Sequence, residues 1–448
     1  MKNPSLLLVQ KYLPLLFLFS LLIFQSQEVK AQFANGADIG WLSQMEYQRF
    51  IFKDSTGVQK DCLDILKEKG INALRFRVWV NPSGGYCNKK DVAYMAKRAD
   101  NKGFKVMLDF HLSDTWADPG HQNKPAAWAT HTMSQLTTDV ANHITDILDS
   151  LKAEGVTPAW VQIGNETNDG TLWEDGRATK NMSNFAAIIK SGYDAVKAID
   201  TSIQVIVHIS DGHNNTLYRW MFDGLKNNGA KWDIIGMSVY PYWANLTWQK
   251  DDSLALINMK DMISRYQTKI MICEAGYLFN QPVEANHYLM DLISKTKSVG
   301  GLGVFYWEPE SNPQKFPSQG YNLGAWDPTT LEPTVAMDAF MGNYVTEVSD
   351  EKNNVPSSFY LYQNYPNPFN PATTIKYSVS NRAQVSLIIY SMLGEQVKIL
   401  LNNNVDAGEH SINWRGTNNF GEPVPSGIYF IRLDAGGNNL VRKMVLLK

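Results

Sequence analysis

Cysteine is scarce in this chain of 448 residues, which contains only Cys62, Cys87 and Cys273. No CxxC motif or His/Cys spacing is present, so the sequence predicts no metal site. An odd number of cysteines leaves at least one thiol in an exported protein. Cys62 begins a predicted helix and Cys87 follows the next strand, so these two are candidates for a disulfide. Cys273 lies inside a strand, where a small buried side chain is expected.

The chain also lacks a charge excess and an apolar run long enough to span a membrane. Lys and Arg number 41 against 44 Asp and Glu, a net charge of −3, so no basic field attracts nucleic acid or acidic membranes. The apolar run Leu13–Phe24 is too short to cross a bilayer. It follows Lys2 and Lys11 and ends shortly before Ala31, a pattern typical of a signal peptide covering residues 1–31. The mature protein is therefore expected to be exported and soluble, or attached to the cell by other means.

Aromatic residues are abundant instead, at 12% with 13 Trp and 20 Tyr, which suits a surface that stacks on sugar rings. The length predicts two domains. We place a barrel domain at residues 32–345, a polar linker at 346–358 and a second domain at 359–448. Short β runs with turn signals predict a small β-sandwich for the second domain. Its predicted strands include Thr373–Val379, Val385–Met392, Ser411–Trp414, Gly427–Asp434 and Leu440–Leu447.

The first domain alternates strands with helices, which predicts an α/β fold of the (β/α)₈ or TIM barrel type. Its strands are mostly continuous apolar runs, as expected for strands covered on both faces. They are Asn35–Trp41, Ala73–Trp79, Lys105–His111, Trp160–Glu166, Gln204–Ser210, Ile234–Pro241, Lys269–Ala275 and Gly300–Pro309. Helical periodicity separates them, for example at Val58–Lys69, Asp91–Lys102, Leu136–Glu154, Asn184–Ile199 and Glu284–Thr296.

Polar and aromatic side chains gather where these strands end, which is where (β/α)₈ barrels carry their reactive residues. Any single one of them is explained equally well as a loop-edge residue, but the whole set is not. His111 and His208 in particular are as often structural as they are ligands. The candidates for substrate binding are Asp38, Arg75, Arg77, His111, Asp114, Trp116, Asn165, His208, Tyr240 and Trp307.

Glu166 and Glu274 are the candidate catalytic residues. Glu166 ends WVQIGNE on the fourth strand and Glu274 ends the apolar part of KIMICEAGY on the seventh, so they can face each other across the barrel mouth. A lone Glu at a strand end often merely starts a loop, but two close carboxyls suit retaining glycoside hydrolysis. Glu274 is the expected nucleophile, held ionised by a second-strand arginine and Tyr240. Glu166 is the expected acid/base.

Residues near this pair are expected to bind and orient the sugar. Asn165 is expected to bond the 2-hydroxyl of the sugar, a contact that strengthens in the transition state. Trp307 offers a flat floor for the ring and Trp116 a second platform along a cleft. His111 and His208 are expected to orient hydroxyl groups.

These segments resemble clan A glycoside hydrolases and, within them, family 53, the endo-β-1,4-galactanases. The resemblance covers about Phe33 to Tyr344, and its most specific part is His111–Trp128. It implies retaining hydrolysis of β-1,4-galactan, the side chain of pectic type I arabinogalactan, with Glu166 as proton donor and Glu274 as nucleophile. The matching segments are GADIGWL, LRFRVWVNP, LDFHLSDTWADPGHQNKPAAW, VQIGNET and ICEAGY.

Two departures from the family pattern bear on the site. Many bacterial members carry a longer, acidic loop after the seventh strand that binds calcium. Here Tyr277–Glu284 is short and has one carboxylate, which argues against calcium, and no other cofactor is expected. The residue after the nucleophile is Ala275 instead of the usual Thr or Ser, a mild change that leaves the chemistry intact.

The C-terminal segments YQNYPNPFNPATTIKYSV, SMLGEQV, GEHSINWRG and PSGIYFIRL resemble the sorting domain of type IX secretion in Bacteroidota-like bacteria. This resemblance implies passage across the outer membrane by that machinery, removal of the tail, and release or surface anchoring. A carbohydrate-binding module is the competing interpretation. Beyond Trp414 the segment has few tryptophans that look exposed, which favours sorting.

The sequence therefore predicts a secreted or cell-surface monomer that hydrolyses β-1,4-galactan and binds no nucleic acid. Another clan A endo-glycanase, such as a mannanase or xylanase, would share both carboxyls but need not share His111–Trp128. A non-catalytic glycan-binding surface protein would be expected to have lost one carboxyl.

Overall fold

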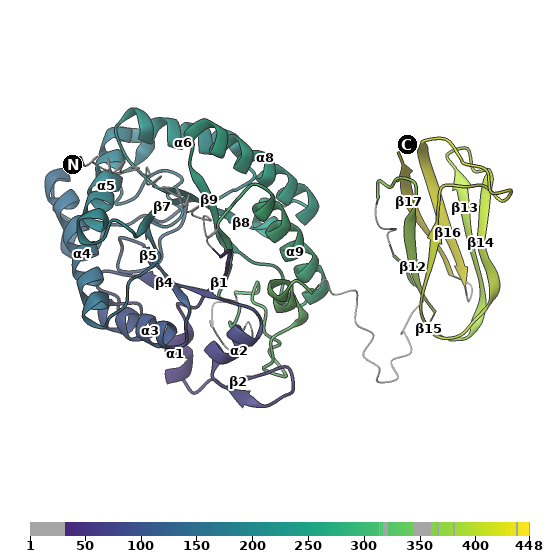
Figure 1. The fold of residues 1–448 in the computed structure, drawn as a ribbon, viewed down its shortest axis with the longest axis horizontal. Helices are drawn as coiled ribbons and strands as arrows, with labels where there is room; N and C mark the ends of the chain where they lie inside the picture. The colour runs from purple at the N-terminus through teal and green to yellow at the C-terminus, as the bar shows by residue number, and fades with distance from the viewer. Residues whose placement is uncertain are drawn as a thin grey trace, which may run out of the picture. The chain divides into compact units, whose positions relative to one another are not determined.

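The computed structural model describes residues 32–312, 314, 316, 321–343, 360–362, 364, 367–379, 381–435 and 438–447. The chain divides into two compact units, Met1–Val345 and Thr346–Lys448 (Figure 1). The expected signal peptide, residues 1–31, and the expected linker, residues 346–358, lie outside the described residues.

The first unit contains a closed barrel of parallel strands in the order β1-β10-β9-β8-β7-β6-β5-β4. This confirms the predicted (β/α)₈ barrel. Several strands end earlier than predicted, because Trp41, Asn165 and Glu166 already belong to the loops above the sheet. The strands are β1 (Ala34–Asp38), β4 (Ala73–Val78), β5 (Lys105–Phe110), β6 (Trp160–Ile163), β7 (Gln204–Ile209), β8 (Ile234–Val239), β9 (Lys269–Ala275) and β10 (Gly303–Trp307).

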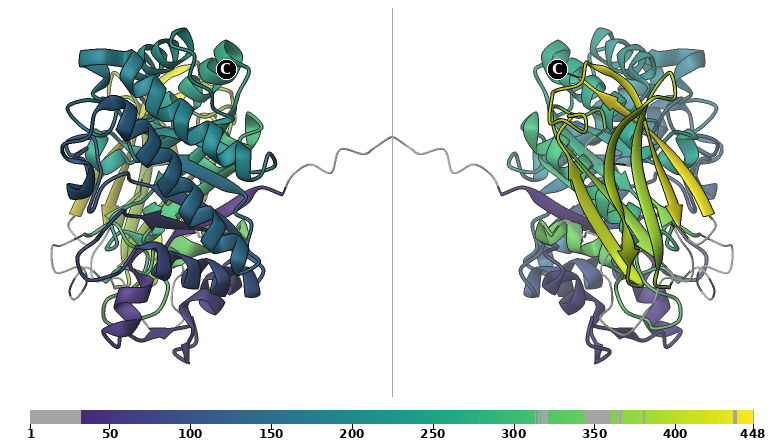
Figure 2. Two further views of the ribbon diagram at one scale, coloured as in Figure 1. Left: turned by 90° about the vertical axis from the view of Figure 1, so that its left-hand side faces the viewer. Right: turned by 90° about the vertical axis from the view of Figure 1, so that its right-hand side faces the viewer.

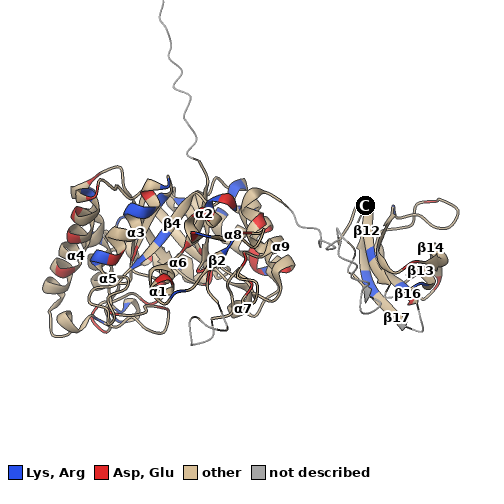
Figure 3. Cartoon of the chain, turned by 90° about the horizontal axis from the view of Figure 1, so that it is seen from below, with Lys and Arg blue, Asp and Glu red and all other residues tan. Residues whose placement is uncertain are grey.

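Helices surround these strands, as Figure 1 shows for α3, α4, α5, α6, α8 and α9. Acidic and basic residues are interspersed along them (Figure 3). Of the helices that the structure describes, none combines the length and apolar character that crossing a membrane requires. The helices are α1 (Leu42–Tyr47), α2 (Cys62–Glu68), α3 (Lys89–Asn101), α4 (Met133–Ala153), α5 (Ala178–Ile199), α6 (Asn215–Asn227), α7 (Pro241–Ala244), α8 (Trp248–Tyr266) and α9 (Pro282–Ser298), with 3-10 turns at Ala126–Trp128 and Val335–Met341.

The second helix starts later than its apolar pattern predicts. The expected segment Val58–Lys69 is helical only from Cys62, because Gln59–Lys60 (β3) pairs with Phe52–Lys53 (β2) as a short hairpin. Asp61 then caps the helix, since its carboxylate accepts a hydrogen bond from the backbone N–H of Leu63 at 2.8 Å.

The interior of the barrel is layered by the two-residue period of its strands. Near the start of the strands, a buried apolar layer closes the interior; its members include Ala34, Ala73, Met107, Trp160, Ile206, Ile234, Met271 and Phe305. Two positions further along several strands, the inward side chains are polar: Arg75, Asp109, Gln162 and His208. The polar side chains therefore form the next layer above the apolar one, on the side of the barrel mouth.

Glu274 reaches this interior through an irregularity in β9. Cys273 belongs to the apolar floor, so strict alternation would turn the next residue outward. The pairing register shifts at this point against both neighbours, β8 and β10. Such a bulge adds a residue to one strand and re-aims its side chains. Glu274 therefore contacts Arg75 inside the barrel.

All three cysteines are free, buried thiols. Cys62 and Cys87 therefore do not form the disulfide that the sequence left open. Cys87 instead donates a weak hydrogen bond from Sγ to the carbonyl oxygen of Gly40 at 3.4 Å. The thiol of Cys273 contributes to the apolar floor, in agreement with its expected buried role.

In its described residues the second unit forms two antiparallel sheets, as expected for a β-sandwich, and their strands run side by side in Figure 2. Its core includes Tyr377, Leu387, Trp414, Ile431 and Leu446. Trp414 is 1% exposed, so it packs in this core instead of facing a sugar. The sheets are formed by β11 (Tyr360–Leu361), β12 (Thr373–Val379) and β15 (Gly408–Trp414), and by β14 (Gln396–Val405), β13 (Ala383–Ser391), β16 (Gly427–Ala435) and β17 (Asn438–Leu446).

Candidate active site

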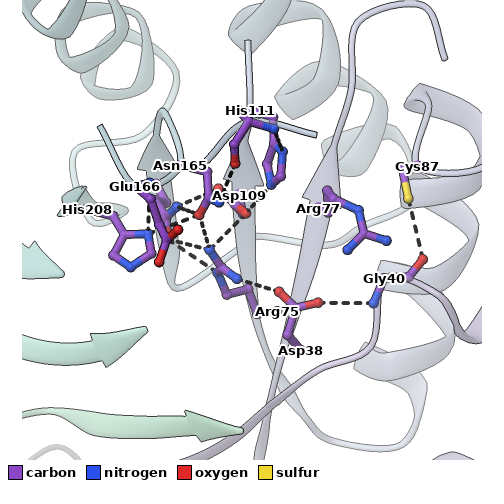
Figure 4. Close-up of polar contacts among 12 residues, drawn as sticks. Asp38, Gly40, Arg75, Arg77, Cys87, Asp109, His111, Asn165, Glu166 and His208 are labelled. Atoms are coloured by element: carbon purple, nitrogen blue, oxygen red, sulfur yellow. Dashed lines mark hydrogen bonds and ion pairs between the residues drawn. The ribbon is translucent and has the colours of Figure 1, made fainter. Parts of the chain in front are cut away.

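Arg75 is the centre of a buried network at the barrel mouth (Figure 4). Its Nη1 donates to Asp38 Oδ2 at 2.6 Å and to Glu274 Oε1 at 2.9 Å. Its Nη2 donates to Asn165 Oδ1 at 2.9 Å and lies 2.8 Å from Asp109 Oδ2. Breaking a buried ion pair by removing one partner costs about 3–5 kcal/mol, so this arrangement is rigid. The network fixes the orientation of Glu274 and Asn165 together.

Glu274 is held at both carboxylate oxygens. Arg75 binds Oε1, and the Tyr240 hydroxyl donates to Oε2 at 3.1 Å. Burial raises the pKa of Glu274 to about 7, and the positive charge of Arg75 opposes this rise. The carboxylate therefore points in one fixed direction and has a cation that stabilises its ionised form.

Among the described residues Glu166 has no such cation, and its carboxyl contacts the hydroxyl of Ser238, 2.6 Å from Oε1. Burial raises the pKa of Glu166 well above its usual range, and the negative charge of Glu274 raises it further. Of the two carboxyls, Glu274 thus ionises more readily and Glu166 retains its proton. This order is what a reaction with one nucleophilic and one proton-donating carboxyl requires.

A cavity of about 330 Å³ opens beside Glu166. Most of the residues that line it lie outside the predicted substrate-binding set, among them Ser210, Asp211, Ser238 and the exposed Trp243. The ring of Trp243 packs against Tyr240, with centroids 4.3 Å apart. The two-residue period from Tyr240 back to Ser238 is a signal that could have identified the serine.

Trp307 and Trp116 belong to an aromatic cluster around Trp41. The Trp41 ring lies 5.1 Å from Trp307 and 5.6 Å from Trp116, edge to face in both cases. Trp116 and Trp307 are only half-buried, so each leaves part of its ring accessible. The cluster can present flat apolar surface to a sugar at the barrel mouth.

Arg77 lies under this cluster and away from Glu274. Its Nη1 donates to Glu308 Oε1 at 2.9 Å, and its guanidinium stacks 4.1 Å from the centre of Trp116. Figure 4 shows it apart from the Arg75 network. Arg77 is 1% exposed, so it supports the aromatic surface from below.

His111 and Asp114 are both occupied by neighbouring protein groups. His111 Nε2 lies 2.9 Å from Asp109 Oδ2, and its Nδ1 accepts the backbone N–H of Ala117 at 3.1 Å. Burial lowers the pKa of His111, which keeps it neutral. Asp114 accepts the backbone N–H groups of Asn81 and Ala126 at 2.8 and 2.9 Å, so it fastens two loops.

Among the described residues, no group of three or more His, Cys, Asp and Glu side chains is arranged to hold a metal ion. The loop after β9 offers only Glu284, whose carboxylate accepts the indole N–H of Trp248 at 3.0 Å. This single carboxylate does not fit a calcium-binding loop, which needs several oxygen ligands. The absence of a cofactor stays a prediction.

Two carboxyls of different proton affinity, one fixed by a cation and one beside an open cavity, can cleave a glycosidic bond at the mouth of this barrel. The fold and the site are those of a glycoside hydrolase. Residues 34–287 match the profile of Glycosyl hydrolase family 53, and the chain belongs to this family.

Similar proteins agree with this assignment. The arabinogalactan endo-beta-1,4-galactanase of Cellvibrio japonicus is 34% identical over 307 residues, which are 61% of this chain and 79% of the relative. The GH53 catalytic domain of Ignisphaera aggregans superposes with a TM-score of 0.62 at 30% identity, over 69% of this chain and 95% of that one. One of two fungal beta-1,4-galactanases gives a TM-score of 0.64 at 26% identity, over 69% and 98% of the two chains.

The C-terminal unit has a separate match. Residues 363–447 fit the profile of a Secretion system C-terminal sorting domain. This finding indicates that the protein is secreted or placed at the cell surface.

Proposed function

We propose that this protein is an endo-acting hydrolase of β-1,4-galactan, the side chain of type I arabinogalactan, and that it retains the anomeric configuration. The observation that carries the proposal is the pair Glu166 and Glu274, one proton-bearing and one held by Arg75, in a family 53 barrel. The galactanase relatives point to the same substrate.

The two carboxyls act in sequence. Glu166 protonates the glycosidic oxygen while Glu274 attacks the anomeric carbon. A covalent glycosyl-enzyme forms, and the galactan fragment that carries the protonated oxygen leaves. The ionised Glu166 then takes a proton from water, and the resulting hydroxide releases the sugar from Glu274. Arg75 and Tyr240 keep Glu274 ionised and aimed.

The remaining predicted site residues divide by exposure. Trp116, Trp307 and Asn165 line the mouth and contact sugar, with the side-chain amide of Asn165 held by the carbonyl oxygen of Ala117 at 2.9 Å. Five of the others are at most 2% exposed and hold the contacting groups from beneath: Asp38, Arg75, Arg77, His111 and His208. Asp114 fastens the loops of the mouth.

Hydrolysis of purified polysaccharides tests the proposal. The protein is expected to shorten β-1,4-galactan rapidly, with new reducing ends appearing along the whole chain, and to leave β-1,4-mannan, xylan and cellulose intact. Cleavage of one of those glycans but not galactan would reassign the substrate within clan A. Binding to galactan without any cleavage would support the non-catalytic alternative.

We further propose that residues 1–31 direct export, that 32–345 form the catalytic domain, and that 346–358 link it to a sorting domain at 359–448. The sorting-domain match supports passage through the type IX secretion machinery. The protein is proposed to act on its polysaccharide as a monomer.

Removal of residues 359–448 is expected to leave galactan hydrolysis by purified protein unchanged, since both carboxyls lie in the first unit. In the native host the same truncation is expected to retain the enzyme inside the outer membrane. Activity measured in the medium, on the cell surface and in the periplasm distinguishes these outcomes. Normal secretion of the truncated enzyme would exclude a sorting role for the tail.

A further inference from the structure

Ser238 connects Glu166 to a chain of buried side chains. Its Oγ lies 2.6 Å from Glu166 Oε1 and 2.9 Å from Nε2 of His208. The other ring nitrogen of His208, Nδ1, lies 3.0 Å from Asn165 Oδ1. Ser238 is 1% and His208 0% exposed, so neither is expected to contact a polysaccharide directly. Figure 4 shows His208, Asn165 and Glu166 grouped beside Arg75.

Arg75 fixes the direction of the hydrogen bonds in this chain. A guanidinium only donates, so the Asn165 atom that faces Arg75 Nη2 at 2.9 Å is the amide oxygen. The same oxygen faces His208 Nδ1, which must therefore carry the hydrogen. Burial and the nearby charge of Arg75 lower the pKa of His208 well below its usual value, so the ring is neutral and Nε2 has no hydrogen.

The direction continues to Glu166. Because His208 Nε2 is an acceptor, the single hydroxyl hydrogen of Ser238 points to it. Ser238 Oγ then offers only a lone pair to Glu166 Oε1. The carboxylic acid form of Glu166 can donate a hydrogen bond to this lone pair. An ionised Glu166 would instead place a carboxylate oxygen against the lone pair.

The opposite pattern is available but less favourable. If Glu166 is ionised, Ser238 donates to it, and His208 must carry its hydrogen on Nε2. His208 Nδ1 then accepts the backbone N–H of Glu166 at 3.4 Å, a long contact that the first pattern gives up. In exchange, Nδ1 faces the oxygen of Asn165 lone pair to lone pair at the shorter distance of 3.0 Å. The network therefore favours one protonation state of Glu166.

From this geometry we propose that Ser238 and His208 are positioning residues, which present a hydrogen-bond acceptor to Glu166 and hold it in the proton-bearing form until the proton is delivered. While Glu166 is ionised and acts as base, the Ser238 hydroxyl turns its hydrogen toward Glu166, and His208 carries its hydrogen on Nε2. Both groups return to the first arrangement when Glu166 regains its proton. This inference rests on the proposed acid/base role of Glu166.

Other charged groups face the same side chains and act in known directions. Besides burial, the charges of Glu274, Asp211 and Asp118 raise the pKa of Glu166, whereas a hydrogen bond donated by the Ser238 hydroxyl lowers it. Around His208, Asp109 raises the pKa while Arg75 and His111 lower it. None of these groups replaces the acceptor that Ser238 supplies, so the effect of Ser238 can be measured separately.

The alkaline limb of kcat/KM on galactan tests the proposal, because it reports ionisation of the acid in the free enzyme. Ser238→Ala removes the acceptor for the acid form, so the limb is expected to move to lower pH by about half a unit or more. A limb that stays in place or moves to higher pH would overturn the proposal, since an ordinary donor to the carboxylate gives the opposite sign.

Thr167→Val is the matched control. It also removes a buried hydroxyl beside Glu166, but that hydroxyl donates to the backbone oxygen of His208 at 3.0 Å and not to its ring. The alkaline limb of this variant is expected to coincide with that of the wild type. Thermal unfolding of both variants shows whether a change in profile accompanies a loss of folding.

A second readout needs no substrate and observes the wild-type enzyme directly. In ¹⁵N spectra of ring-labelled histidine, the His208 signal, identified by its loss in His208→Asn, is expected to show a hydrogen on Nδ1 at acidic pH and on Nε2 once Glu166 ionises. A hydrogen on Nε2 throughout would overturn the proposal. If the wild type fails to cleave galactan, the proposed function falls, while this measurement still decides the direction of the network.

Discussion

Glu274→Gln is expected to reduce the hydrolysis of galactan by about 10⁴-fold or more. The amide keeps the volume of the side chain and can still accept a hydrogen bond from Arg75 or Tyr240. It cannot attack the anomeric carbon, so no glycosyl-enzyme forms. Reducing-end release from galactan measures the loss, and a change in kcat with little change in KM is expected because the sugar contacts remain.

Glu308→Gln is the matched control for this substitution. Glu308 is also a buried glutamate paired with an arginine of β4 at 2.9 Å, and burial raises its pKa to about 7 as well. It pairs with Arg77 under the aromatic cluster and away from Arg75. The control is expected to lower the thermal stability but to retain measurable hydrolysis. Equal inactivation of both variants would mean that Glu274 acts through the fold instead of through chemistry.

Glu166→Ala is expected to have an effect that depends on the leaving group. With galactan, whose leaving oxygen needs a proton, kcat/KM is expected to fall by about 10²–10⁴-fold. With an aryl β-galactobioside that carries an acidic phenol, formation of the glycosyl-enzyme needs no proton donor and remains fast. The intermediate then accumulates, because no base activates water, and a burst of phenol precedes a slow steady state.

Asp211→Asn controls for the loss of a nearby negative charge. Asp211 lines the same cavity, and its charge acts on Glu166, but it is not bonded to Ser238 or Glu274. This variant is expected to show the same dependence on the leaving group as the wild type. A burst in this variant, or none in Glu166→Ala, would contradict the assigned roles.

The strand ends of the barrel were predictable because their physics is local. The two-residue period of a strand determines which side chains face inward, and the inward position of Arg75 follows from it. The bulge that aims Glu274 inward was not predictable, since it depends on pairing with β8 and β10. That Cys62 and Cys87 remain free thiols was likewise not predictable, because it depends on the packing around them.

The support beneath the site was harder to find than the site itself. Asp109 and Gln162 lie in the middle of apolar strands and bond each other at 2.5 Å, so nothing in their neighbouring sequence marks them. The roles of His208 and Ser238 depend on hydrogen-bond directions that begin at Arg75 on another strand. In the second unit, β14 is not among the predicted strands, because its polar end, residues 402–404, lies exposed at the edge of a sheet.

The configuration of the product formed by Glu166→Ala in the presence of azide tests the central claim most directly. Azide is a nucleophile that needs no base, and Ala leaves space for it beside the anomeric carbon. If Glu274 forms a covalent glycosyl-enzyme, azide is expected to restore turnover of the aryl β-galactobioside and to give the β-galactobiosyl azide, identified by its anomeric proton coupling. An α-azide would indicate direct displacement without a covalent intermediate and would contradict the account of Glu274 as nucleophile and Glu166 as acid/base.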